Sequence, residues 1–226
     1  ARSRECVREA DGWDMKTLQL HLRDLGRPLV DAWLEEFSGF ANVQISHGDI
    51  FSTREGVVEA TAPIDIRADA IVSPANSFGF MDGGIDAVYT YQLGPQLQRN
   101  LQQLLEASFD GELPIGQAVI VPTERDEIPW LIAAPTMRSP SVVAETANAY
   151  LAFRAALLAV REHNRTNTAS PIRSVLCPGL ATAVGRMPVA RCARQMRIAW
   201  ERVVLERRFR PRTVGAADRD DAELLR

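Results

Sequence analysis

The spacing of apolar residues along this chain changes between two patterns. Short apolar runs and alternating stretches predict strands, and they occur at residues 15–23, 43–50, 70–72, 118–122, 130–134 and 175–177. Apolar positions three and four residues apart predict helices, and they occur from Pro28, from Ile85, at 146–163 and from Pro188. Because helices separate most of the strands, we expect an α/β fold. Its form would be a three-layer α/β/α sandwich with a mixed, mainly parallel central sheet.

The same pattern predicts a helix break, a loop and the inward-facing residues of two helices. Gly94-Pro95 interrupts the helix from Ile85, which predicts a short helix, a kink and a second helix. Segment 51–67 has mixed charge and weak periodicity and is expected to be a loop with one short helix at most. The residues expected to face inward are Val30, Trp33, Leu34 and Phe37 in the first helix, and Ala147, Tyr150, Leu151, Ala155 and Leu158 in the helix at 146–163.

The length of 226 residues fits one domain with extensions. Residues 1–14 are polar and aperiodic and are expected to form a flexible leader. Residues 15–209 are expected to form a single domain, and residues 210–226 a frayed, charged tail.

Composition narrows the functional classes. The net charge of −3 argues against a nucleic-acid partner, and no apolar run is long enough to indicate a membrane span. Three unclustered cysteines indicate a reducing compartment, and we expect a cytoplasmic location. His21, His47 and His163 lie far apart in sequence, so no metal site is expected. The sequence does not indicate an oligomeric state.

The segment from Asp69 to Asp86 carries the clearest chemical signal. An apolar strand ends in a polar Asn76 and continues through Gly83-Gly84 into a helix. Such a turn exposes unpaired backbone N–H groups, which bind anions. Ligands of parallel sheets lie beyond the carboxyl ends of the strands. The loops after Ile50, Val72 and Cys177 meet that condition, and all three bear glycine.

These residues resemble the motifs of the macro domain family, the ADP-ribose-binding α/β modules. The matching segments are Gly48-Asp49-Ile50, Asp69–Asn76, Gly83-Gly84-Ile85-Asp86 and Leu93-Gly94-Pro95-Gln96-Leu97. The resemblance implies ADP-ribose or an ADP-ribosylated protein as the partner, and no cofactor.

The resemblance also implies roles for individual residues. Asp49 would accept a hydrogen bond from the adenine amino group, Asn76 would hold the distal ribose, and Asp86 would orient or deprotonate a water. Each has an alternative reading, because Asp49 can cap its turn, Asn76 can form an Asx turn, and Asp86 can stabilise a helix dipole. The expected ligand-binding residues are Asp49, Ile50, Asn76, Phe80, Gly83, Gly84, Ile85, Thr182, Ala183, Val184, Gly185 and Arg186, and the expected catalytic residues are Asp86 and Asn76.

Several positions depart from the family pattern. Ser73 stands where the family's first Asn is expected, Thr90 where hydrolase members often carry His, and Gly185 where an aromatic residue usually leans on the distal ribose. Phe78 or Phe80 could supply that aromatic cover, or both could pack beneath the loop as core.

The resemblance leaves three activities open. The first is hydrolysis of an ADP-ribosyl ester on a protein carboxylate by a positioned water. The second is a non-catalytic ADP-ribose reader, which the departures at Thr90 and Ala183 favour. The third is a phosphatase acting on ADP-ribose 1″-phosphate. We expect the hydrolase.

Overall fold

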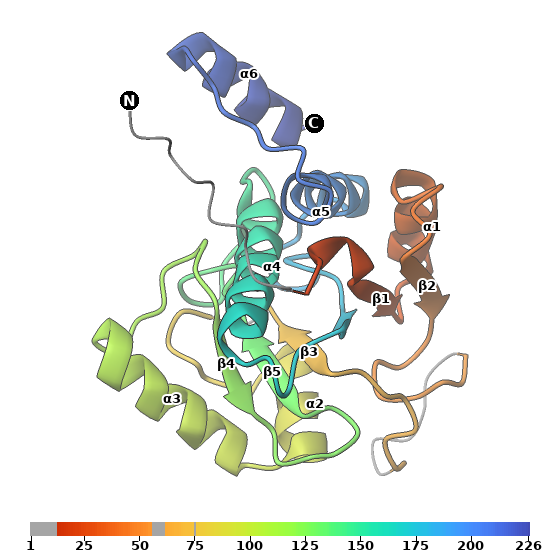
Figure 1. The fold of residues 1–226 in the computed structure, drawn as a ribbon, viewed down its shortest axis with the longest axis vertical. Coiled ribbons are helices and arrows are strands. Elements are labelled where there is room, and N and C mark those ends of the chain that lie inside the picture. The colour runs from red at the N-terminus through yellow and green to blue at the C-terminus, as the bar shows by residue number, and fades with distance from the viewer. Residues whose placement is uncertain (1–12, 56–61, 75) are drawn as a thin grey trace, which may run out of the picture.

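The computed structural model describes residues 13–55, 62–74 and 76–226. A central six-stranded sheet carries helices on both faces (Figure 1). The strands are β1 (Gln19–Asp24), β2 (Val43–His47), β3 (Ala70–Ser73), β4 (Val119–Pro122), β5 (Trp130–Ala133) and β6 (Ser174–Cys177). Their order is β2-β1-β6-β3-β5-β4, and every adjacent pair is parallel except the antiparallel pair β4 and β5. The predicted mixed, mainly parallel sheet is confirmed.

The helices bury two separate cores, one on each face of the sheet. They are α1 (Arg27–Glu36), α2 (Gly84–Leu93), α3 (Gln96–Phe109), α4 (Asn148–Thr166), α5 (Val189–Val203) and α6 (Val214–Leu224), after a short 3-10 turn η1 (Met15–Thr17). Successive side chains of β3 point to opposite faces of the sheet. Ala70 and Val72 therefore belong to the core beneath α1, α4 and α5, and Ile71 belongs to the core beneath α2 and α3. The three-layer sandwich is therefore confirmed.

The predicted break at Gly94-Pro95 is confirmed, since α2 ends at Leu93 and α3 begins at Gln96. Gly94 has a φ of 104°, which an L-residue with a side chain rarely adopts. The break turns the chain so that α2 and α3 cover the same face of the sheet.

One inward-facing prediction is wrong, and another is only partly right. Leu34 is exposed on α1. Of the five positions predicted in the helix at 146–163, Ala155 is buried, and Tyr150 and Leu158 are half-buried and pack against the core. The prediction missed the rest of the buried set, which is Ala149, Ala152, Phe153, Ala156, Leu157, Val160 and Asn164. The α4 helix is apolar on most of its sides, so spacing alone does not define which side packs.

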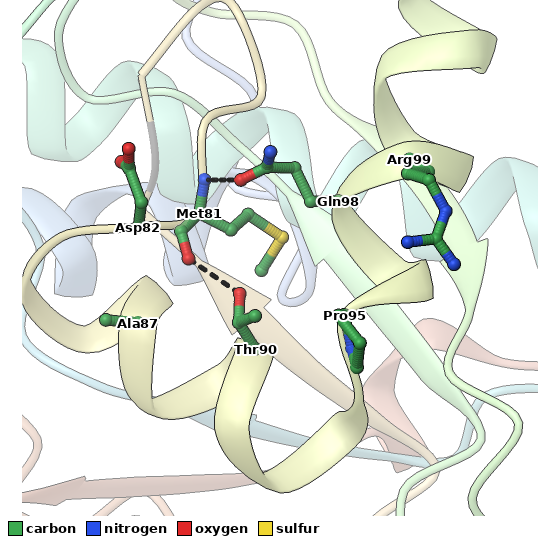
Figure 2. Close-up of a pocket in the computed structure, with 7 residues that line it drawn as sticks. All are labelled: Met81, Asp82, Ala87, Thr90, Pro95, Gln98 and Arg99. Carbon is green, nitrogen blue, oxygen red and sulfur yellow. Dashed lines mark hydrogen bonds between the residues drawn. The ribbon is translucent and has the colours of Figure 1, made fainter.

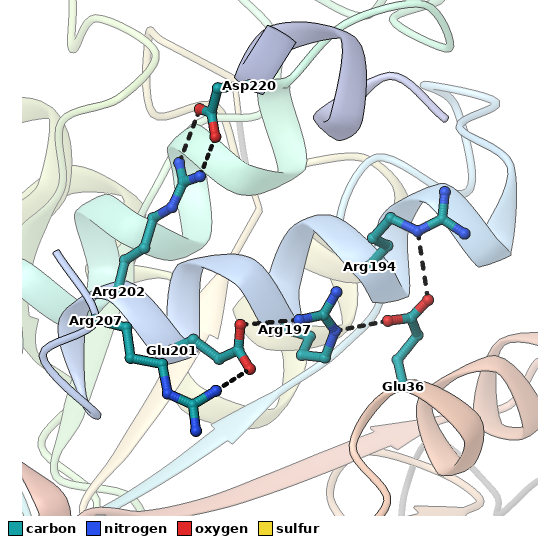
Figure 3. Close-up of polar contacts among 7 residues, drawn as sticks. All are labelled: Glu36, Arg194, Arg197, Glu201, Arg202, Arg207 and Asp220. Atoms are coloured by element: carbon teal, nitrogen blue, oxygen red, sulfur yellow. Dashed lines mark hydrogen bonds and ion pairs between the residues drawn. The ribbon is translucent and has the colours of Figure 1, made fainter. Parts of the chain in front are cut away.

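The expectation of a frayed end at 210–226 is also wrong, because α6 forms there and packs on α5. Arg202 on α5 forms an ion pair with Asp220 on α6 (Figure 3). Gln195 on α5 donates a hydrogen bond of 2.8 Å to the carbonyl oxygen of Leu224. Thr213 caps the start of α6 by accepting the N–H of Ala216. These contacts hold a polar helix that the periodicity did not indicate.

The predicted leader lies mostly outside the described residues, which begin at Trp13. The indole of Trp13 packs against the core beneath α1, α4 and α5, and Asp14 caps η1. Of the predicted loop 51–67, the described residues form turns and bends without a helix, and residues 56–61 lie outside the description. No helix among the described residues is long and apolar enough to cross a membrane.

Candidate functional site

Five parallel strands end at the same edge of the sheet, and their loops are linked to one another there. At the end of β1, the carbonyl oxygen of Asp24 accepts the Gly48 N–H at 3.0 Å, and the Asp24 carboxylate accepts the Gly179 N–H at 3.1 Å. The end of β1 therefore joins the loop after β2 to the loop after β6.

The loop after β3 joins this edge through the segment after β5. Asn76 forms an isolated parallel bridge with Met137, and the Ser77 N–H donates to the carbonyl oxygen of Arg138 at 3.1 Å. Further along, the Val143 N–H donates to the carbonyl oxygen of Gly185 at 2.9 Å. The three loops predicted to form the site are therefore connected, with the segment after β5 between two of them.

Asp49 and Ile50 follow β2. The Asp49 carboxylate accepts the Phe51 N–H at 2.9 Å, so it caps its own turn. Ile50 is buried in the core beneath α2 and α3, which leaves its backbone as the part that can face a ligand. The buried guanidinium of Arg23 donates to the carbonyl oxygen of Asp49 at 2.7 Å and fixes the turn from below.

Asn76 shapes the loop after β3 with its own side chain. Its carbonyl oxygen accepts the N–H groups of Phe78 (3.1 Å) and Phe80 (3.3 Å), and its amide nitrogen donates to the carbonyl oxygen of Phe80 at 2.8 Å. The Asx-turn reading of Asn76 is therefore present in the structure. One amide N–H has no hydrogen bond within the described residues and can donate to a ligand.

Phe78 and Phe80 differ in environment. The guanidinium of Arg138 lies 4.8 Å from the centroid of the Phe78 ring, and the same guanidinium forms two hydrogen bonds with Glu112, at 2.7 and 2.9 Å. Phe80 is 51% exposed, with its ring centroid 6.5 Å from that of Phe78. Phe78 is thus held against the protein, while Phe80 is available at the surface.

The turn at Gly83-Gly84 opens α2 with free space around it. Gly83 is the N-cap and has no side-chain cap, and Gly84 has a φ of 56°. A Cβ built on either glycine would have no atom within 4 Å. The first amides of a helix have no partner inside the helix, so the N–H groups of the first turn, including Ile85, can bind an anion.

Asp86 lies in that first turn but is turned inward. The Ser73 hydroxyl, at the end of β3, donates to its carboxylate at 2.6 Å, and Asp86 is 7% exposed. Burial raises the pKa of Asp86 to about 6, and the hydrogen bond from Ser73 partly opposes that rise. Asp86 is thus a carboxylate whose ionisation falls near neutral pH, directly beneath the glycine turn.

The loop after β6 is tightly folded. The N–H of Arg186 donates to the carbonyl oxygen of Ala183, and Met187 N–H donates to that of Ala181, both at 3.0 Å. A Cβ at Gly185 would lie 2.4 Å from the Ala181 carbonyl oxygen, which explains why no aromatic residue stands there. The exposed members of this loop are Ala183, Val184 and Arg186, with Thr182 half-buried.

Three contributors to this edge were missing from the sequence prediction. They are the buried Arg23, the hydroxyl of Ser73 as the partner of Asp86, and the segment after β5. The strand order was the missing signal, because β5 is parallel and central, so the segment after it must reach the same edge.

A cavity of about 330 Å³ lies beside this edge, between α2 and α3 (Figure 2). It is lined by Met81, Asp82, Ala87, Thr90, Pro95, Gln98 and Arg99. None of these belongs to the predicted set of site residues, so the cavity is adjacent to the predicted site and not part of it. Within the described residues, no group of His, Cys, Asp and Glu is arranged to hold a metal ion.

Comparison with known proteins agrees with the motifs. The sequence model of the Macro domain family matches residues 72–196. An uncharacterized protein of Aquifex aeolicus is 34% identical over 133 residues, which cover 58% of this chain and 72% of that protein. The macrodomain of Mycobacterium tuberculosis DarG superposes with a TM-score of 0.51 at 20% identity, covering 62% of this chain and 86% of that one.

A Trypanosoma brucei macrodomain in complex with ADP-ribose is 21% identical, with a TM-score of 0.46 over 61% of this chain and 53% of that one. The family assignment rests on the sequence model, which spans more than half of the chain. This chain belongs to the macro domain family.

Proposed function

We propose that this chain binds ADP-ribose at the carboxyl edge of its sheet, with the pyrophosphate on the first amides of α2. The observation that carries the proposal is the uncapped, open turn at Gly83-Gly84. A pyrophosphate fits a helix N-terminus because the amides donate to it and the helix dipole favours negative charge.

The remaining parts of the ligand follow from the family pattern. The adenine would lie at Asp49 and Ile50, and the free N–H of Asn76 would donate to a hydroxyl of the distal ribose. The backbone of residues 182–186 would enclose the pyrophosphate from the other side. Membership of a family of ADP-ribose-binding modules supports this arrangement.

Calorimetry with ADP-ribose, ADP and AMP tests the proposal. We expect ADP-ribose to bind, and Gly84→Glu to weaken binding at least about 100-fold by placing a carboxylate beside the phosphates. Gly39→Glu is the matched control, because Gly39 also has a positive φ (86°) and open space and lies after α1, away from this edge. No binding of ADP-ribose by the wild type at millimolar concentration would overturn the proposal.

A second candidate, hydrolysis of an ADP-ribosyl ester on a protein glutamate, is favoured by Asp86. Its carboxylate ionises near pH 6 and lies in the turn that would hold the pyrophosphate. In this reaction a water oxygen attacks C1″, and its proton passes to Asp86. The bond from C1″ to the ester oxygen breaks, and its electron pair leaves with the protein carboxylate.

Incubation with a mono-ADP-ribosylated glutamate protein tests the hydrolase. We expect wild type to release ADP-ribose and Asp86→Asn to be slower by at least about 100-fold, while both bind free ADP-ribose. The wild-type rate should fall as the pH drops below about 6, where Asp86 becomes protonated. Binding without release would indicate a reader, and release of phosphate from ADP-ribose 1″-phosphate would indicate a phosphatase.

We further propose that Phe80 covers the distal ribose in place of the aromatic residue absent at Gly185. Its exposure in the loop between Asn76 and the glycines supports this role, whereas Phe78 is held by Arg138. Phe80→Ala should weaken ADP-ribose binding more than about fivefold, because burial of an aromatic ring is lost. Phe78→Ala is the comparison. If Phe80→Ala changes the affinity for ADP-ribose by less than twofold, the proposal that Phe80 covers the distal ribose is wrong.

We propose a reducing, cytoplasmic location as well. Cys177 and Cys192 are buried free thiols among the described residues, and free thiols persist where glutathione keeps them reduced. Cell fractionation of the native host would test the location.

A further inference from the structure

The cavity between α2 and α3 is not used by the ADP-ribose proposal. Its volume of about 330 Å³ is at the lower end of the range for ligand sites. The volume therefore suits a small group, such as one or two side chains of a bound polypeptide.

The wall of this cavity is held in place by hydrogen bonds to both helices. The Met81 N–H donates to the side-chain oxygen of Gln98 at 2.7 Å, and the Thr90 hydroxyl donates to the carbonyl oxygen of Met81 at 2.6 Å (Figure 2). The Met81 side chain is fully buried. The cavity is thus preformed, so a ligand does not have to order this loop on binding.

Two opposite charges line the cavity from different elements. Asp82 extends from the loop before α2, and Arg99 extends from α3 on the other side of the cavity (Figure 2). Both residues are exposed, and within the described part of the chain neither side chain forms a hydrogen bond or an ion pair. Ala87 and Pro95 add apolar surface between them.

This combination matches the chemistry of a polypeptide that carries a carboxylate. A guanidinium binds a carboxylate through two parallel N–H donors. An aspartate accepts main-chain N–H groups, and the apolar surface accommodates an aliphatic side-chain stem.

The position of the cavity connects it to the proposed reaction. Asp82 precedes Gly83 directly, so its Cα lies within about 8 Å of that of Gly84. In the proposed function, the ester end of the ligand lies at Asp86, two residues further along the same turn. The polypeptide that bears the ester must leave the site near this turn.

We propose that the cavity binds the ADP-ribosylated polypeptide itself. Arg99 binds an acidic side chain that flanks the modified glutamate, and Asp82 accepts a main-chain N–H of the same segment. The inference rests on the proposed function and adds the substrate class, which is a polypeptide modified within an acidic segment.

Binding of two matched peptides tests the inference. Each carries one ADP-ribose attached to a glutamate side chain through a hydrolysis-resistant amide, and the flanking residues are glutamates in one peptide and glutamines in the other. Wild type should bind the glutamate-flanked peptide about fivefold more tightly, the effect of one favourable ion pair at a partly open site. Arg99→Ala should remove this difference while leaving the affinity for free ADP-ribose within twofold.

Charge reversal and a distant arginine provide the controls. Arg99→Glu should favour a lysine-flanked peptide instead. Arg125→Ala removes the same charge from the turn between β4 and β5, at the opposite edge of the sheet, and should keep the wild-type preference. Equal peptide affinities in wild type, or a preference that survives in Arg99→Ala, would overturn the inference alone. Failure of the wild type to bind free ADP-ribose would overturn the proposed function, and this inference with it.

Discussion

The carboxyl group of Asp86 lies in a buried position where its ionised form is unfavourable. Its folded pKa of about 6 lies above its ordinary value of 3.8 because the group is buried. The folded state therefore binds this proton more tightly than the unfolded state does. The resulting stability is fully present below about pH 4 and is lost as the pH rises through 6, by up to about 3 kcal/mol.

Asp86→Asn should therefore stabilise the protein at pH 7.5, because the amide has no charge to desolvate and its oxygen can still accept the Ser73 hydroxyl. The gain in free energy of unfolding should be about 1–3 kcal/mol at pH 7.5 and should shrink toward zero at pH 4. Urea unfolding at both pH values measures it. Asp82→Asn, at an exposed carboxylate, is the control. A variant no more stable than wild type at pH 7.5 would contradict the assigned burial.

At the residue scale, the sequence predicted positions better than contacts. Asn76 and Asp86 were expected in the loop after β3 and in the first turn of a helix, and both lie there. The Asx turn of Asn76 depends on neighbours within four residues, so the sequence could predict it. The close packing around Gly185, by contrast, involves the side chain of Val143, which is more than forty residues away in sequence. No local pattern indicates that contact.

At the scale of the elements, the C-terminal helix α6 is one that the spacing of apolar residues did not predict. The α6 helix has only two large apolar residues, Val214 and Leu224, and its attachment is largely polar. Arg202 pairs with Asp220, donates to the Tyr150 hydroxyl at 3.0 Å and lies 4.8 Å from the centroid of the Phe209 ring. The local signal was the capping residue Thr213, which often precedes a helix.

Arg202→Ala should detach α6 from α5. We expect a loss of about 1–3 kcal/mol in free energy of unfolding, since the side chain is 15% exposed and makes charged hydrogen bonds. Hydrogen exchange at residues 214–224 should quicken. Arg207 lies after the end of α5, and its 65% exposed side chain forms an ion pair with Glu201 on α5 (Figure 3). Arg207→Ala should change stability by less than about 1 kcal/mol. Unchanged exchange in α6 of the Arg202 variant would show that other contacts hold the helix.

At the scale of the whole molecule, the alternation of strands and helices predicted the parallel sheet but not the strand order. The order depends on pairings between distant residues. The Asp69 carboxylate, for example, accepts the N–H groups of Arg173 and Ser174 at 2.7 and 2.8 Å. Such contacts arise from the fold as a whole, and so does the composition of the site, which combines loops from both halves of the chain.

A ligand that bridges these loops should stabilise the whole fold. ADP-ribose at 100 times its Kd should add about 2.7 kcal/mol, which corresponds to a rise of roughly 5–10 °C in Tm for a chain of this size. Hydrogen exchange should slow together in the loops after β2, β3 and β6, because the proposed binding mode places one ligand against all three. Gly84→Glu should show neither effect at the same concentration. Protection confined to the loop after β3 would mean that the ligand binds the glycine turn alone, and the three-loop site would then be wrong.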